Sequence, residues 1–305
     1  MRADENDSLS WQRLGEAYAR SGRHVAAIKA LKRTLELQPT DWMSLYLLGE
    51  VYRLMGQYDE AIEVFEAVRT QQPDEICVLM ALSDTHLDHA RIQSAEGFRS
   101  RAESSAIDAV FVAIELIDKS PGFRKLTWKI AGDAAFELSR FTSFDEPNLV
   151  FEALTSLTSL IGHQESSVGY VKEIVDLPIT REVDSIDGTF ALEVAIATYD
   201  YRISLDKLDD ISAGSALFDL GVALSTLSNR ISDKSRAASA ITQAKTLVTK
   251  ALNMDPLNDV YWNALGNLNF VENPKLAQHA YIKASECDAK VSRTNYFLNI
   301  FLTRI

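Results

Sequence analysis

The side chains with the clearest potential for chemistry are two histidines in the first third of the chain. His86 and His89 are three residues apart, a spacing that places both imidazoles on one face of a helix. Such a pair is typical of a zinc site, but zinc needs three or four ligands. The neighbouring sequence supplies no others, so we expect His86 to fill a packing position and His89 to lie at the surface.

Two other motifs resemble sites for an ion or for thiol chemistry. Asp184–Gly188 reads DSIDG and resembles the opening of a calcium loop, but it lacks the alternating acids and the terminal glutamate. Cys77 and Cys287 are the only cysteines, and two distant thiols form neither a metal motif nor a disulfide framework. The sequence contains no phosphate-binding loop and no nucleophile elbow. We therefore predict no catalytic, cofactor-binding or metal-binding residues, and a protein that is not an enzyme.

The composition is that of an acidic, packed protein. The 305 residues include 43 Asp and Glu against 31 Lys and Arg, which gives a formal net charge of −12. Nucleic acid binding depends on clustered cations, so direct contact with nucleic acid is not expected. The N-terminus lacks the apolar core of a signal peptide, and no stretch approaches the ~20 apolar residues of a membrane helix. These features favour a cytoplasmic location, with the nucleus as the alternative, and no membrane partner.

The elements that must position any site come from an internal repeat of 34 residues. Pro39 and Pro73 are 34 residues apart, and so are Gly15 and Gly49. The same spacing relates Leu14 to Leu48, Tyr18 to Tyr52, Gly22 to Gly56, Ala27 to Ala61, and Leu31 to Phe65. A repeat of this length is typical of stacked helix pairs, each of which completes its core against its neighbours.

Small residues at fixed places predict how each pair packs. Leu14 and Tyr18 are four residues apart and share one face of a first helix. Gly15, and Ala27 on the second helix, are small where the two helices must cross closely. Gly22 lies where the first helix must stop and reverse, which favours a residue that tolerates positive φ. We therefore predict an all-α fold, an α-solenoid of stacked antiparallel helix pairs with an irregular helical middle section.

The repeat divides the chain into regular and irregular segments. The expected segments are 1–103 for N-terminal copies (8–39, 42–73 and a degenerate 76–103), 104–211 for a degenerate helical region with a loop at about 162–188, and 212–290 for C-terminal copies (214–257 with an insertion at 229–239, then 259–290). In the third copy, Ala95 and Ala102 take the small positions. The tail, 291–305, lacks the Leu-Gly pair of a following repeat, so we expect a fragment or a mispredicted gene end.

The first copy resembles the tetratricopeptide repeat (TPR) family. The pattern of that family is W-x2-L-G-x2-Y, followed by Ala, by an aromatic residue or Leu, and by Pro. The residues that the resemblance assigns to TPR packing are Trp11, Leu14, Gly15, Tyr18, Ala27, Pro39, Leu48, Gly49, Tyr52, Ala61, Phe65, Pro73, Gly221, Pro256, Trp262, Leu265, Gly266, Ala277 and Tyr281. It implies a module for protein–protein interaction.

The first helices should line a concave groove. The candidate protein-binding residues on this side are Gln12, Glu16, Tyr46, Glu50, Arg53, Asn263, Asn267 and Phe270. Their mixture of aromatic, amide and charged side chains suits the docking of a peptide or protein. Any solvated concave wall has a similar composition, so the pattern alone does not select among these positions.

The order of the segments narrows the resemblance. The copies that contain DSLSWQRLGEAYAR and SALFDLGVALS, with WKIAGDAAFELSRF between them, resemble the large TPR scaffold subunits of superkiller (Ski) complexes over most of the chain. This resemblance implies two partners, an RNA helicase and a β-propeller protein, and a role in cytoplasmic 3′-to-5′ decay of messenger RNA by the exosome. Two other hypotheses stay open: a generic TPR adaptor of another multiprotein assembly, and an enzyme with its site in the middle segment.

Overall fold

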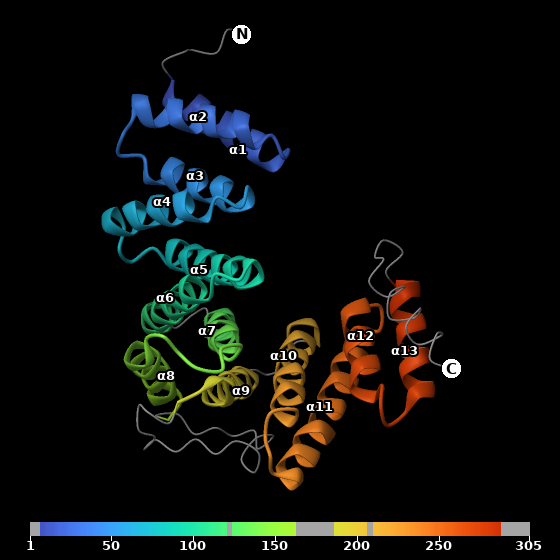
Figure 1. Ribbon diagram of the computed structural model, residues 1–305. Coiled ribbons are helices and arrows are strands. Elements are labelled where there is room, and N and C mark those ends of the chain that lie inside the picture. Colours follow the sequence, from blue (N-terminus) through green and yellow to red (C-terminus); the bar gives the residue numbers. More distant parts are fainter. Residues whose placement is uncertain (1–6, 121–123, 163–185, 206–209, 288–305) are drawn as a thin grey trace. The chain divides into compact units, whose positions relative to one another are not determined.

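The computed structural model describes residues 7–120, 124–162, 186–205 and 210–287. Within these ranges it contains thirteen α-helices and no strand (Figure 1), which confirms the predicted all-α class. The chain divides into two compact units, Met1–Phe123 and Arg124–Ile305. The loop expected at about 162–188 lies almost entirely outside the described residues, and the tail at 291–305 lies wholly outside them.

The first unit is a stack of three antiparallel helix pairs, shown in blue to green in Figure 1. Each first helix packs on its own second helix, and that second helix packs on the next first helix. The pairs are α1 (Ser8–Arg20) with α2 (His24–Leu37), α3 (Trp42–Leu54) with α4 (Tyr58–Gln71), and α5 (Ile76–Glu96) with α6 (Arg99–Lys119). Stacking buries the apolar side that a single pair leaves open.

Glycines and prolines set where these helices end. Gly22 and Gly56 have φ values of 72° and 74°, in the left-handed region where a Cβ would strain the backbone. Both stand in the reversal between a first and a second helix, as the sequence predicts. Pro39 and Pro73 are exposed in the linkers that follow α2 and α4, where a residue without a backbone N–H does not continue a helix.

The helices of the third pair are about two turns longer than those of the second. Its turn glycine, Gly97, also has a positive φ, 87°, but it follows Gly56 by 41 residues rather than 34. The excess of seven residues corresponds to about two helical turns. Accordingly, α5 and α6 have 21 residues each, whereas α3 has 13 and α4 has 14. The third pair therefore extends past the second at its turn end.

The longer helices change which residues occupy the small positions of the third pair. Ala95 is exposed near the end of α5 and does not lie on the second helix at all, so its assignment was wrong. Ala109 of α6 takes that place, and its carbonyl accepts a hydrogen bond of 2.9 Å from the Ser83 hydroxyl. A fixed 34-residue period misses this shift because seven residues are added to each helix. As a result, α6 also runs without a break through residues 103 and 104.

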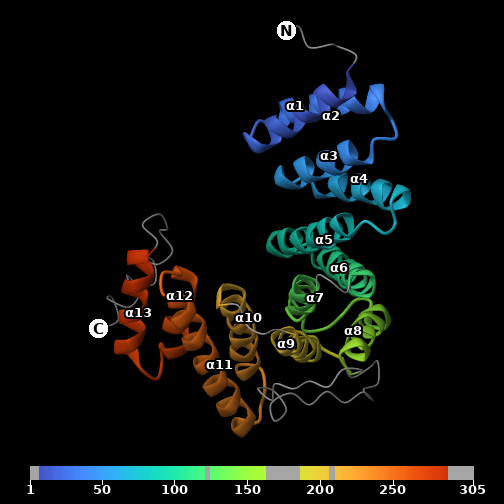
Figure 2. The ribbon, with the colours of Figure 1, turned by 180° about the vertical axis from the view of Figure 1, so that it is seen from behind.

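The second unit contains the remaining seven described helices, yellow-green to red in Figures 1 and 2. They are α7 (Arg124–Leu138), α8 (Pro147–Gly162), α9 (Gly188–Ser204), α10 (Asp210–Ser228), α11 (Lys234–Met254), α12 (Asp259–Asn269) and α13 (Pro274–Cys287). Two sequential pairs, α10 with α11 and α12 with α13, follow the pattern of the first unit. The main partner of α7 is α9 rather than its neighbour in sequence, α8.

Every pair except the third crosses at a glycine of its first helix. A Cβ added to these glycines would lie only 2.5 to 2.9 Å from a side-chain atom of the second helix. The facing pairs are Gly15 with Leu31, Gly49 with Phe65, Gly132 with Tyr199, Gly221 with Val248, and Gly266 with Tyr281. Real Cβ contacts of that length do not occur, so the small residue is what allows the two backbones to approach.

The crossing at Gly132 reveals a repeat that the sequence hid. Gly132 of α7 packs against Tyr199 of α9 as Gly49 packs against Phe65. Trp128 precedes Gly132 by four residues, which is also the spacing from Trp11 to its own glycine. The irregular middle section therefore holds a helix pair whose two halves are separated by α8 and its flanking chain. The long separation of its two halves removes the 34-residue period.

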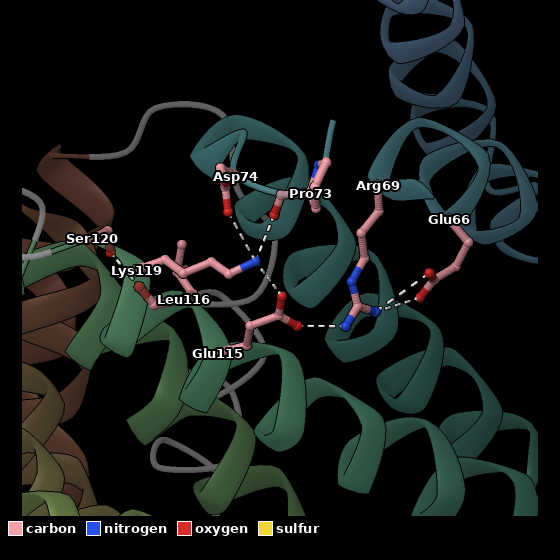
Figure 3. Close-up of polar contacts among 8 residues, drawn as sticks. All are labelled: Glu66, Arg69, Pro73, Asp74, Glu115, Leu116, Lys119 and Ser120. Atoms are coloured by element: carbon pink, nitrogen blue, oxygen red, sulfur yellow. Dashed lines mark hydrogen bonds and ion pairs between the residues drawn. The ribbon is translucent and has the colours of Figure 1, made fainter. Parts of the chain in front are cut away.

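Charged side chains connect the second and third pairs (Figure 3). Arg69 of α4 forms an ion pair with Glu66 at 3.0 Å and another with Glu115 of α6. Lys119 of α6 lies 2.9 Å from Glu115 and donates a hydrogen bond of 2.6 Å to the carbonyl of Pro73. These side chains are all partly exposed, so each contact contributes little stability alone. Together they fix the position of α6 against α4 and the linker before α5.

Replacement of Gly49 with Leu should overpack the crossing between α3 and α4. Because the ring of Phe65 occupies the space that the new side chain needs, we expect a loss of roughly 1–3 kcal/mol in the free energy of unfolding. Thermal and denaturant unfolding would measure it. The matched control is Glu63→Leu, which adds the same side chain at an exposed position of α4. Equal midpoints for the two variants would contradict the close crossing.

Candidate protein-binding surfaces

Most residues assigned to TPR packing are buried at or beside the helix crossings. The buried ones are Gly15, Ala27, Leu48, Gly49, Ala61, Phe65, Gly221, Leu265, Gly266, Ala277 and Tyr281. Four aromatic ones, Trp11, Tyr18, Tyr52 and Trp262, are half-buried. Leu14 is 38% exposed, because α1 has described neighbours on one side only. Pro256, like the two earlier prolines, is exposed in a linker.

The candidate groove residues of the first unit lie on one side of adjacent first helices. We call this side the first-helix face; it comprises Gln12 and Glu16 of α1, Tyr46, Glu50 and Arg53 of α3, and Asp84 and Asp88 of α5. The amide of Gln12 donates a 3.1 Å hydrogen bond to Asp41 at the start of α3. The ring of Tyr46 lies 5.8 Å from that of Phe65. Burial, with a smaller effect of Glu50, raises the pKa of Tyr46 to about 12, so its hydroxyl stays protonated.

Acids and arginines alternate along the first-helix face. Glu50 and Arg53 form an ion pair of 3.1 Å, and Arg53 reaches across to Asp88 of the next repeat at 3.5 Å. On α1, Glu16 pairs with Arg20 at 2.6 Å. Sequence reasoning had not included Asp84 or Asp88, although Asp84 stands 34 residues after Glu50 and the period alone would have found it. The face presents polar groups with a charge pattern rather than a catalytic constellation.

The candidate residues of the last pair lie partly in other contacts. The Tyr281 hydroxyl donates a hydrogen bond of 2.8 Å to the side-chain oxygen of Asn267, so this amide is joined to α13. Asn263 is half-buried on α12, and Phe270 caps the end of that helix. The indole of Trp262 donates to the carbonyl of Pro256 at 2.8 Å. These contacts leave Asn263 as the candidate with the fewest assigned partners.

The motifs that suggested ion binding have structural roles. In the described residues, no three His, Cys, Asp or Glu side chains come together as ligands for a metal ion. Asp187 of the DSIDG motif caps α9, where its carboxylate accepts hydrogen bonds of 3.0 Å from the N–H groups of Thr189 and Phe190. Cys77 and Cys287 are free. Among the described helices, none combines the length and the apolar character needed to cross a bilayer.

A cleft lies beside each pair whose helices exceed those of its neighbour. In the first unit, a cleft of about 650 Å³ is bounded by the end of α5, the start of α6 and the start of α4. In the second unit, α10 and α11 have 19 and 21 residues beside an α12 of 11, and a cleft of about 370 Å³ lies between their ends and α12. Insertions into a repeat thus open space at the step where helix length changes.

The sequence of this chain is similar to one repeat family. Residues 13–76 match the tetratricopeptide repeat family. This chain carries tetratricopeptide repeats. The same range covers the first two TPR pairs, where the glycine crossings and the turn glycines repeat most regularly. A solved tetratricopeptide repeat protein from Parabacteroides merdae aligns over 97% of this chain and 98% of that one, with 12% identity and a TM-score of 0.47.

Longer proteins resemble the whole of this TPR chain. It is 26% identical over 276 residues to superkiller protein 3 of Schizosaccharomyces pombe, which covers 88% of this chain and 19% of that protein. It is also 26% identical over 292 residues to superkiller complex protein 3 of Mus musculus, covering 92% and 17%. The chain therefore spans less than a fifth of the length of these two relatives.

A buried acid in α9 makes the stability of the second unit depend on pH. Asp200 is 6% exposed, and its Oδ1 has no hydrogen-bond partner. Burial raises the pKa of this carboxyl from 3.8 to about 7. The unfolded chain thus loses the proton near pH 4 while the folded chain retains it, so this group's contribution to stability falls as pH rises from about 4 to 7.

Asp200→Asn should remove that contribution. We expect the free energy of unfolding of the variant to decline less between pH 4 and pH 7 than that of the parent chain, because an amide does not ionise. Denaturant unfolding at several pH values would measure the slope. Asp118→Asn changes an exposed carboxyl of α6 and should leave the slope unchanged. Identical slopes for the parent and Asp200→Asn would refute the assignment.

Proposed function

We propose that this chain is a non-catalytic scaffold segment of a superkiller-type complex. In that role it holds an RNA helicase and a β-propeller protein that act with the exosome in cytoplasmic 3′-to-5′ decay of messenger RNA. The chemistry would belong to the helicase and the exosome, and the TPR pairs would supply binding surfaces. The observation that carries the proposal is the similarity to superkiller proteins along about nine-tenths of the chain.

The physical features of the chain support a scaffold. Each helix pair spends its apolar side on its neighbours, which leaves the first-helix face and the clefts as solvent-accessible surfaces with aromatic, amide and charged groups. Surfaces of this mixed composition are typical of protein interfaces. The charge of −12 opposes direct binding to RNA, whose recognition needs clustered cations. Two free thiols fit the reducing cytoplasm.

Affinity purification of the full chain from its own cells is the direct test. The chain would be tagged at its own locus, captured at physiological salt, and its partners identified by mass spectrometry. Recovery of a helicase together with a β-propeller protein is the expected result. Clean recovery of a different set of partners, without these two, would reject the superkiller role and favour an adaptor for another assembly.

A variant of the first-helix face would show whether that surface carries the binding. We expect Tyr46→Ala combined with Glu50→Lys to lower partner recovery at least about ten-fold, because it removes an aromatic anchor and reverses a charge. The control, Thr70→Ala combined with Glu63→Lys, also truncates one side chain and reverses one charge, but at exposed positions of α4. Circular dichroism should show the same helix content for both variants. Equal loss of partners in both would place the binding elsewhere.

A further inference from the structure

The cleft at the turn end of the third pair has the form of a side-chain pocket. Because α5 and α6 extend about two turns past α4, the end of α5 and the start of α6 form two walls, and the first residues of α4 form the base. The side chain of Phe98, 50% exposed, supplies an apolar patch at one side. At about 650 Å³, the cleft is large enough for a long side chain and part of the segment that carries it.

One group in the wall of this cleft is buried without a hydrogen bond. His86 is 8% exposed, and its Nδ1 has no hydrogen-bond partner. The nearest carboxylate oxygen, on Asp108, is 3.9 Å away, which is too far for a hydrogen bond. Burial lowers the pKa of His86 to about 4, so the ring is neutral near pH 7 and keeps one nitrogen as an acceptor.

The second histidine differs because its contacts are made within the protein. The Nε2 of His89 lies 2.8 Å from the amide nitrogen of Gln93, whose oxygen in turn accepts a 2.9 Å hydrogen bond from Ser105. The ring of His89 also stacks on Tyr58 at 5.4 Å. This network fixes the wall of the cleft around His86, so the unsatisfied nitrogen belongs to a rigid surface.

Carboxylates outnumber cations around the cleft. Asp59 from α4, Glu96 from α5 and Asp108 from α6 line it, and the side chain of Asp59 is almost fully exposed. The single lining cation other than the histidines, Arg101, lies over the ring of Phe98 with its guanidinium carbon 5.5 Å from the ring centre. The charge of the lining therefore favours a positively charged occupant.

We propose that this cleft binds an arginine side chain from a segment of a partner protein. A guanidinium has five donors in a planar fork, which suits two carboxylates on opposite walls, Asp59 and Asp108, together with the acceptor nitrogen of His86. Its flat face also packs on an aromatic ring such as Phe98. A lysine offers a single compact charge and is the weaker fit, and a phosphate-bearing partner is disfavoured by the three acids. The proposal rests on the proposed protein-binding function.

Histidine NMR on the intact chain tests the proposal without any natural partner. The chain would be labelled in its histidine rings and titrated with acetyl-Gly-Arg-Gly-amide, with the lysine peptide, and with the citrulline peptide, which has a similar shape but no charge. We expect the arginine peptide to shift the ring signals of His86 and His89, the lysine peptide to do so more weakly, and the citrulline peptide to leave them in place. Equal shifts by the arginine and citrulline peptides, or none by the arginine peptide, would overturn the proposal.

Removal of the cleft charges provides the second measurement. Asp59→Asn combined with Asp108→Asn should weaken binding of the arginine peptide about ten-fold or more, whereas Asp118→Asn, at an exposed site further along α6, should not. An equal effect of both variants would also overturn the assignment. Because the peptides are added to the purified chain, this result does not depend on whether a superkiller-type complex is recovered from cells.

Discussion

The close crossing of two helices within each pair is the interaction on which the structure depends. At five crossings a glycine lies directly against a large side chain of the second helix, such as Phe65 or Tyr199, and at the sixth Ser83 bonds to the backbone of Ala109. Close approach lets each pair form a dense layer, with apolar side chains projecting to both neighbours. The stack, its exposed faces and its clefts all follow from that geometry.

Helix length is free to vary once the crossing is fixed. Residues added symmetrically to the two helices of a pair lengthen its turn end without changing the crossing, as seven residues do in α5 and α6. The split pair of α7 and α9 is the extreme case, because a whole helix and more lie between its halves while Gly132 and Tyr199 still meet. Variation at the turn end creates clefts, so diversity in binding surfaces costs the core little.

The charged groups act where the packing leaves freedom. The contacts of Arg69, Glu115 and Lys119 join three successive elements at the linker end, whereas Arg53 joins α3 to α5 across the first-helix face. Such pairs are half-exposed and weak one by one, but they orient neighbouring pairs whose apolar contacts have little directional preference. A scaffold needs this, since partners recognise the relative position of several repeats.

The sequence by itself determined the helix pairs, the turn glycines and the small residues of the regular repeats. These are local properties: periodicity defines a helix face, and Gly22 or Gly49 is required by its own backbone or by one nearby side chain. Tertiary structure alone decided that Ala109 replaces Ala95, that α9 rather than α8 completes the pair begun by α7, and that His86 lines a cleft. Each of these depends on contacts between residues far apart in the chain, and insertions change those contacts without leaving a period to detect.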